Sequence, residues 1–204
     1  MPLRGLYAIT DDALLAGRLL PAVEAALLGG CRIVQYRSKQ ADTARQHSEA
    51  TDLLQLCRQH DAILLVNDNL ALAEKIGADG VHLGQEDMSL AEARQALGNN
   101  AIIGITCHNS LTLAQQAQAG SANYVAFGRF FPSDTKQSAP PADLSVLQQA
   151  RGGLHIPLVA IGGITLDNAL TVLAAGADML AVVGDLFSHP DIAARSRHYT
   201  ALFT

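Results

Sequence analysis

The chain alternates between short apolar runs and longer amphipathic segments along its whole length. Each apolar run is rich in branched residues and stops at polar residues or glycine, which is typical of a buried strand. The strands predicted in this way are Leu3–Thr10, Cys31–Tyr36, Ala62–Val66, Gly80–Leu83, Ala101–Thr106, Ala122–Phe127, Pro157–Ile161 and Met179–Val183.

Helices are predicted between these strands, because apolar residues there recur at helical spacing. Local signals support two of the helix starts: Pro21 suits a first helical turn, and Ser89 with Glu92 has the spacing of a capping box. The predicted helices are Pro21–Leu28, Thr43–His60, Leu70–Ile76, Ser89–Leu97, Leu111–Ala119, Leu144–Ala150, a segment from Thr165, and Asp191–Leu202.

The regular alternation of strands and helices predicts a (β/α)8 TIM barrel that forms one domain over residues 1–204. The alternative is an open, doubly wound sheet, which would leave two or more of the predicted strands without a place. In either fold, ligands bind beyond the carboxyl ends of the parallel strands, so polar residues at those ends are the candidates for function.

Two carboxylates stand at such ends in the stretch Ala62–Asp87, which is predicted to be a strand–helix–strand unit. Asp68 follows the first strand of this unit and Asp87 follows the second. Three interpretations are open: a general acid/base pair, ligands for a hard cation, or N-caps of the helices that follow. An anion site nearby would favour the cation, because Mg²⁺ binds one or two carboxylates together with phosphate oxygens.

Basic residues indicate such an anion site. Of three lysines in this acidic chain, Lys39 follows the second strand, Lys136 lies in an irregular loop, and Lys75 lies in a helix. Gln35, Arg37 and Lys39 alternate by two, so their side chains are expected on one side of the strand end. Arginine and lysine together suit phosphate oxygens, and the alternative is a set of surface ion pairs with helix carboxylates.

Glycines after the last two strands suggest a second phosphate site. Gly162-Gly163 and Gly184 stand where barrels of this kind often bind phosphate through backbone N–H groups, although a purely conformational role is the alternative. The irregular segment Gly128–Ala142 is long for a loop of a compact domain, and loops of this length usually have a function. Within it, Ser133, Asp134 and Thr135 stand beside Lys136 and could close over the same region.

Composition excludes several other functions. Net charge is −5 with a pI near 5.7, which argues against nucleic-acid and anionic-membrane surfaces, and no stretch approaches the roughly 18 apolar residues of a membrane span. No signal peptide is recognised, and Cys31, Cys57 and Cys107 are expected to be reduced thiols of a cytoplasmic protein. Cys107 and His108 are adjacent in a strand and should face opposite sides, which excludes a nucleophile–base pair.

Zinc is not supported either. His82, Asp87 and His108 have no compact ligand spacing, and His82 lies within a predicted strand, which favours a structural or supporting role for it.

In this order, the motifs resemble the thiamine-phosphate synthase (thiamine-phosphate pyrophosphorylase) family. Each motif alone is weak, but together they span nearly the whole chain. They are YAITD at Tyr7–Asp11, QYRSK at Gln35–Lys39, ND at Asn67–Asp68, DGVHLGQED at Asp79–Asp87, SDTK at Ser133–Lys136 and AIGGIT at Ala160–Thr165.

The resemblance implies a (β/α)8 transferase that joins an aminopyrimidine diphosphate to a thiazole phosphate with release of diphosphate. It implies one Mg²⁺ per subunit on Asp68 and Asp87, with Arg37, Lys39 and Lys136 as catalytic residues. The implied pyrimidine-diphosphate contacts are Gln35, Tyr36, Arg37, Ser38, Lys39, Asn67, Thr106 and Lys136, and the implied thiazole-phosphate contacts are Ser133, Asp134, Thr135, Gly163, Val183 and Gly184. The expected partners are these small molecules, with no nucleic acid and no membrane, and no oligomeric state is predicted.

Three positions depart from the common family pattern. Thr106 stands where serine is common, Arg129 where proline is common, and Gly184 where serine is common. None of these changes removes a charge that the implied chemistry needs. Competing hypotheses are a related thiazole tautomerase, a phosphate-binding isomerase or aldolase that would need Lys39 as its base, and a binding module without turnover. Joint retention of the carboxylates and the basic residues speaks against the tautomerase.

Overall fold

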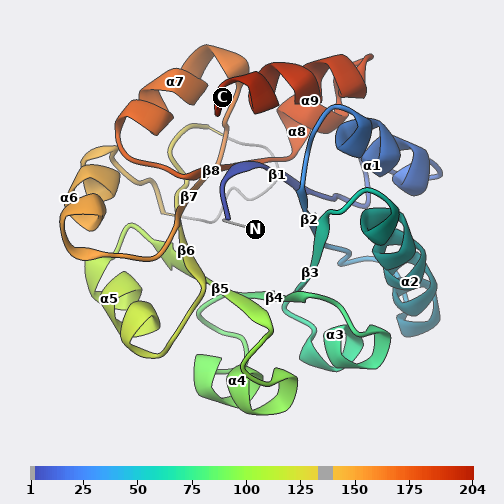
Figure 1. Ribbon diagram of the computed structural model, residues 1–204, viewed down its shortest axis with the longest axis horizontal. Coiled ribbons are helices and arrows are strands. Elements are labelled where there is room, and N and C mark those ends of the chain that lie inside the picture. The colour runs from blue at the N-terminus through green and yellow to red at the C-terminus, as the bar shows by residue number, and fades with distance from the viewer. Residues whose placement is uncertain (1–2, 133–139) are drawn as a thin grey trace.

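The computed structural model describes residues 3–132 and 140–204. Its strands form a closed parallel barrel in which each strand pairs with the next along the chain and β8 pairs with β1, which confirms the predicted fold class (Figure 1). The strands are β1 Gly5–Ile9, β2 Ile33–Tyr36, β3 Ile63–Asn67, β4 Gly80–Leu83, β5 Ile102–His108, β6 Tyr124–Phe127, β7 Leu158–Ile161 and β8 Met179–Val182.

Helices form a ring outside the barrel, as Figure 1 shows. They are α1 Leu19–Leu28, α2 Thr43–Gln59, α3 Leu70–Ile76, α4 Leu90–Leu97, α5 Leu111–Ala119, α6 Ser145–Gly153, α7 Leu166–Ala174, α8 Gly184–Phe187 and α9 Ile192–Ala201. The predicted helices are all present within a few residues of their expected ends. The short helix α8 was not predicted, because four residues are too few to show helical periodicity.

Side chains at the helix ends explain where several helices begin. Asn69 caps α3 by accepting a hydrogen bond from the backbone N–H of Leu72 at 3.0 Å. Ser89 and Glu92 form the predicted capping box at the start of α4. These caps matter for the site, because they occupy the capping role that was one interpretation of Asp68 and Asp87.

Two apolar layers hold the barrel together. The larger layer fills the space between the strands and the helices, and it contains Cys107 and Tyr36. The smaller layer lies inside the barrel and is made by alternate residues of the strands, with Tyr7, Leu65 and Tyr124 among its largest members. Because the interior is filled, ligands can reach the protein only at the ends of the barrel and not through it.

Within the described part of the chain, no helix has the length and apolar character needed to cross a membrane.

Candidate active site

The two candidate carboxylates follow neighbouring strands β3 and β4 at the same end of the barrel. Asp68 adopts a left-handed backbone conformation, with φ of 59°, directly before the cap residue of α3. Asp87 folds back on its own loop, where its Oδ2 accepts a hydrogen bond from the Gly84 backbone N–H at 2.7 Å. Neither residue caps a helix, since Asn69 and Ser89 do so, and the capping interpretation is therefore wrong.

The carboxylates of Asp68 and Asp87 lie close enough to interact. Burial and, next, the neighbouring Asp87 raise the pKa of Asp68 from 3.8 to about 6. Asn67 opposes this rise by donating from Nδ2 to Asp68 Oδ2 at 2.6 Å, and the charge of Lys39 also opposes it. A buried carboxyl whose pKa is raised by its burial and by a second carboxyl beside it forms, with that neighbour, a site that a hard cation neutralises.

Among the residues that the structure describes, no cluster of three or more histidine, cysteine, aspartate or glutamate side chains could hold a metal. This observation does not support the zinc alternative of His82, Asp87 and His108. A pair of carboxylates is nevertheless sufficient for Mg²⁺, which takes its remaining ligands from water and substrate phosphate.

Of the basic residues after β2, Lys39 acts on one of these carboxylates, and Arg37 lies beside another carboxylate of the mouth. Lys39 is exposed, and its charge acts on Asp68. Arg37 is about four-fifths buried and lies 3.8 Å from the carboxylate of Asp11, which belongs to the loop after β1. The ion pair expected from the alternative interpretation therefore exists for Arg37, but its partner is a loop residue at the barrel mouth and not a helix carboxylate.

Backbone hydrogen bonds fix the loop that carries Arg37 and Lys39. Thr10 Oγ1 accepts from the Arg37 N–H at 2.8 Å and donates to the Arg37 carbonyl at 3.1 Å. Asp12 Oδ2 accepts from the N–H of Lys39 at 2.6 Å, and the Ser38 carbonyl accepts from Gln46 Nε2 at 3.1 Å. The two cationic residues are thus carried on a loop that is held by the segment after β1 and by α2.

The direction of the Tyr36 side chain limits how one predicted contact can be made. The Tyr36 side chain faces the helices, where its hydroxyl donates to Glu49 of α2 at 2.8 Å. Successive residues of a strand point to opposite faces, and Gln35 takes the inward face, so only the backbone of Tyr36 can serve the mouth. Gln35 donates inside the barrel to the Tyr7 hydroxyl at 2.6 Å. Thr106 Oγ1 lies 2.8 Å from His82 Nε2, which places both side chains on the inner face.

The glycine turn after β7 is required by its surroundings. Gly162 and Gly163 have φ of 96° and 64°, a region that residues with side chains rarely adopt. A methyl group on Gly163 would also collide with the Pro132 carbonyl. The loop after β6 is pinned to this turn, since the Phe131 N–H donates to the Gly162 carbonyl at 3.0 Å.

The two ends of the loop after β6 also pair with each other, because the Ala142 N–H donates to the Arg129 carbonyl at 2.8 Å. The predicted residues Ser133, Asp134, Thr135 and Lys136 lie outside the described residues.

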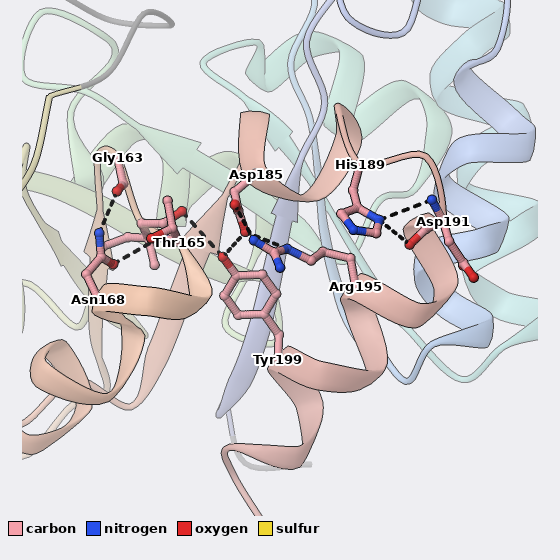
Figure 2. A network of polar contacts seen from close by, with 9 residues as sticks. Gly163, Thr165, Asn168, Asp185, His189, Asp191, Arg195 and Tyr199 are labelled. Atoms are coloured by element: carbon pink, nitrogen blue, oxygen red, sulfur yellow. Dashed lines mark hydrogen bonds and ion pairs between the residues drawn. The ribbon is translucent and has the colours of Figure 1, made fainter.

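A polar network that the sequence did not predict joins the loops after β7 and β8 (Figure 2). Arg195 of α9 binds both oxygens of Asp185, with distances of 2.9 and 2.6 Å, and the Tyr199 hydroxyl donates to the same carboxylate at 2.5 Å. Tyr199 also contacts the Ile164 carbonyl at 3.4 Å. Asp185 directly follows Gly184, so this network holds the two glycine-containing loops against each other.

On the β7 side, Asn168 of α7 secures the turn. Its Nδ2 donates to the Gly163 carbonyl at 2.9 Å, and its Oδ1 accepts from the Thr165 N–H at 3.0 Å. Val183 is the N-cap of α8 and Gly184 its first residue, and a Cβ atom at position 184 would meet no atom of the described residues within 4 Å.

Cys107 is fully buried on the helix side of β5, and burial raises the pKa of its thiol to about 12. It is not a nucleophile at neutral pH, in agreement with the prediction that Cys107 and His108 do not form a dyad.

A parallel (β/α)8 barrel with paired carboxylates, adjacent basic residues and glycine turns at its carboxyl end belongs to the class of phosphate-handling barrel enzymes. The sequence model described as thiamine monophosphate synthase matches residues 6–186. The chain belongs to this family, and it is an enzyme, a transferase of thiamine phosphate synthesis.

Individual relatives agree with this assignment. A thiamine-phosphate synthase of Thioalkalivibrio sulfidiphilus (strain HL-EbGR7) is 54% identical over 202 residues, which cover 98% of this chain and 96% of the relative. The solved thiamine phosphate pyrophosphorylase of Pyrococcus furiosus superposes with a TM-score of 0.87 at 34% identity, covering 98% of this chain and 95% of that one. A pyrophosphorylase of the same name from Bacteroides thetaiotaomicron has a TM-score of 0.69 at 18% identity, over 97% and 95% of the two chains, and shows the fold alone.

Proposed function

We propose that the barrel mouth condenses an aminopyrimidine diphosphate with a thiazole phosphate, giving thiamine phosphate and diphosphate, with Mg²⁺ bound at Asp68 and Asp87. The observation that carries the proposal is the facing carboxylate pair with Lys39 beside it, at the end of the barrel where Arg37 also lies. A diphosphate that is bound by Mg²⁺ and by basic side chains requires carboxylates for the metal and cationic groups for the phosphate at the same place.

The proposed reaction breaks the bond between the methylene carbon of the pyrimidine and the diphosphate oxygen. Diphosphate leaves with the electron pair, and the pyrimidine-methyl cation that remains is captured by the lone pair of the thiazole nitrogen. No proton must be removed for this substitution, which is consistent with a mouth that offers charges for the leaving group, while the Cys107 thiol is buried away from it on the helix side of β5. Arg37 and Lys39 would neutralise the negative charge that develops on diphosphate.

The residues fit a magnesium ion. Asp68 and Asp87 supply hard oxygen ligands, and burial, followed by the neighbouring Asp87, raises the pKa of Asp68, so that a bound cation would stabilise its charged form. When bound, the ion would supply charge neutralisation on the leaving group and orientation of its oxygens.

The thiazole phosphate is placed in this proposal at Gly163, Val183 and Gly184. The positive φ of Gly163 and the open space beside Gly184 favour an approach of the ligand to the backbone N–H groups. Ser133, Asp134, Thr135 and Lys136 are proposed from the family motif to complete the site over this turn. Asn67, Gln35, Ser38 and Thr106 remain proposed contacts of the pyrimidine diphosphate, together with the backbone of Tyr36.

The protein is proposed to act in the cytoplasm. It would do so as one catalytic domain with two small-molecule substrates. Its support is the biosynthetic family of the chain and the three buried thiols.

The test is to incubate the protein with both phosphorylated precursors, in Mg²⁺ and in EDTA, and to separate the products by chromatography. Thiamine phosphate is expected in Mg²⁺ and not in EDTA. Absence of thiamine phosphate in Mg²⁺, from protein with a native circular dichroism spectrum, would contradict the proposal, and isomerised thiazole phosphate alone would identify a tautomerase.

Lysine substitutions test the anion site. Lys136→Ala should lower kcat by at least about a hundredfold, because a positioned charge on a leaving group contributes that much or more. Lys75→Ala removes the same charge from the exposed face of α3 and should leave the rate unchanged. A near-normal rate for Lys136→Ala would remove Lys136 from the proposed catalytic residues.

A further inference from the structure

Five polar side chains form an unbroken chain of hydrogen bonds across the interior of the barrel. Gln35 Nε2 donates to the Tyr7 hydroxyl at 2.6 Å, and the hydroxyls of Tyr7 and Tyr124 lie 2.8 Å apart. The Tyr124 hydroxyl lies 2.8 Å from His82 Nδ1, and His82 Nε2 lies 2.8 Å from Thr106 Oγ1. The chain starts on β2 and ends on β5, on nearly opposite sides of the barrel.

The surrounding packing shows that the chain is a built feature. Tyr7 and Tyr124 are each 1% exposed, and their rings meet edge to face. The Tyr124 ring also stacks on His82, with centroids 5.6 Å apart and planes 19° apart. On the neighbouring strand β5, a methyl group at Gly104 would occupy the space of the Tyr124 phenol. The glycine therefore allows the hydroxyl of Tyr124 to lie between its two partners.

The available hydrogens determine which group donates and which accepts at each link of this hydrogen-bond chain. An amide nitrogen can only donate, so Gln35 provides the hydrogen to Tyr7. The hydroxyl hydrogen of Tyr7 then goes to Tyr124, and that of Tyr124 goes to His82 Nδ1. In any other order a tyrosine hydroxyl hydrogen would be left unused in the barrel core, where water does not replace the lost bond. Burial raises the pKa of both phenols well above the ordinary value, so each keeps its hydrogen.

The direction determines the chemistry at both ends. Because Nδ1 of His82 accepts, the neutral imidazole carries its hydrogen on Nε2 and donates it to Thr106 Oγ1. The hydroxyl hydrogen of Thr106 is then available to a ligand. At the other end, Gln35 uses Nε2 inside the barrel, which leaves its Oε1 to accept from a ligand. The mouth thus presents a fixed acceptor on β2 and a fixed donor on β5.

We propose that Tyr7, Tyr124 and His82 are positioning residues that fix the hydrogen-bond polarity of Gln35 and Thr106 and thereby select an aminopyrimidine. An aminopyrimidine carries an exocyclic amino donor and ring-nitrogen acceptors, which complement the Gln35 acceptor and the Thr106 donor. A 4-oxo pyrimidine presents a carbonyl and a ring N–H instead. Its carbonyl oxygen would face the Gln35 acceptor, and no hydrogen bond could form between the two. The inference rests on the proposed pyrimidine site.

Tyr124→Phe is the variant that cuts the chain at its centre. It retains the aromatic ring and removes only the hydroxyl that joins Tyr7 to His82. We expect the KM and the Kd for the aminopyrimidine diphosphate to rise about tenfold, while the KM for thiazole phosphate stays unchanged. Preference for the aminopyrimidine over its 4-oxo analogue should fall about tenfold. Ser196→Ala, which removes a buried hydroxyl of α9 that donates to the Ala26 carbonyl, controls for lost stability and should change neither pyrimidine quantity.

Nitrogen NMR of histidine-labelled protein provides a readout without turnover, with a His82→Gln spectrum for assignment. Wild type should show His82 with hydrogen on Nε2 and with an unprotonated Nδ1 that accepts the hydrogen bond from Tyr124. In Tyr124→Phe this tautomer should no longer be held. In Tyr7→Phe, Tyr124 still donates to His82, so the tautomer should persist while the pyrimidine Kd still rises through Gln35. A purely structural role would not separate these two variants.

Either of two results would overturn the inference. One is His82 in wild type with hydrogen on Nδ1 or on both nitrogens. The other is an unchanged Kd and unchanged pyrimidine preference in both tyrosine variants. The Kd, measured by calorimetry with the aminopyrimidine diphosphate alone, does not require turnover. If wild type bound this ligand with the expected preference but made no thiamine phosphate, the proposed function would fail while this inference would stand.

Discussion

The charge of Asp68 is expected to reduce the stability of the metal-free protein at neutral pH, and Asp68→Asn removes that charge. Asparagine is nearly isosteric with aspartate and can accept the same hydrogen bond from Asn67 Nδ2. It also tolerates the left-handed backbone at this position, where φ is 59°. The substitution therefore removes one negative charge beside Asp87 and changes little else.

The pKa of Asp68 gives the size and the sign of the effect. Folding raises it from 3.8 to about 6, through burial first and Asp87 second. The folded protein then binds this proton more tightly than the unfolded chain, so stability falls as the pH rises from 4 to about 6 and remains lower above that range. At about 1.4 kcal/mol per pH unit, the upper limit is about 3 kcal/mol, and because Asp68 is only half-buried, solvent screening reduces it to about 1 kcal/mol.

Urea unfolding in EDTA measures this difference directly. Asp68→Asn should raise the free energy of unfolding by about 1 kcal/mol at pH 7.5. At pH 4.5 the increase should be about a third of that, because this pH lies only a little above the pKa of the carboxyl in the unfolded chain. Added Mg²⁺ should stabilise wild type and leave the variant unchanged. Asp52→Asn, on the exposed face of α2, removes the same charge and should show neither effect.

Two outcomes would refute the reasoning about Asp68. The first is a variant that is less stable than wild type at pH 7.5 in EDTA, which would mean that the carboxylate stabilises the fold. The second is equal stabilisation of variant and wild type by Mg²⁺, which would place the metal elsewhere.

Three further substitutions test the proposed phosphate loops. Gly163→Ala should lower the free energy of unfolding by about 1–3 kcal/mol in urea, because of its positive φ and the Pro132 carbonyl, whereas Gly152→Ala on α6 should not lower it. Gly184→Ser enters open space, so unfolding should change by less than about 0.5 kcal/mol, and the added hydroxyl should lower the KM for thiazole phosphate in steady-state assays. Arg195→Met leaves the carboxylate of Asp185 without its cation. It should raise the KM for thiazole phosphate several-fold and leave the KM for the pyrimidine diphosphate unchanged. Equal changes in both KM values would contradict the assignment of this network to the thiazole-phosphate site.

The sequence predicted the barrel because periodicity and strand-end chemistry are local properties. Asp68 and Asp87 could be located at one edge of the sheet from their places in a strand–helix–strand unit alone. Their capping role was excluded only by the structure, since Asn69 and Asp68 are adjacent and both suit a cap. The resemblance implied Tyr36 as a ligand contact without saying which of its atoms would serve, and the closed barrel shows that its side chain faces the helices.

Contacts between residues far apart in the chain could not be predicted. The Asp185–Arg195–Tyr199 network and the chain from Tyr7 to Tyr124 depend on how helices and strands pack, and no spacing in the sequence encodes them. His82 illustrates the limit: its position within a strand indicated a supporting role, but its contacts with Thr106 of β5 and Tyr124 of β6 became evident only in the closed barrel.

The most direct test of the central claim is phosphorus NMR of the protein with equal amounts of the aminopyrimidine diphosphate and thiazole phosphate in Mg²⁺. We predict that free diphosphate and thiamine phosphate appear together in a one-to-one ratio, at a rate that falls strongly in Asp68→Asn and Asp87→Asn. Diphosphate released without thiamine phosphate, or no change in either precursor with folded protein, would contradict the assignment of condensation chemistry to this barrel mouth.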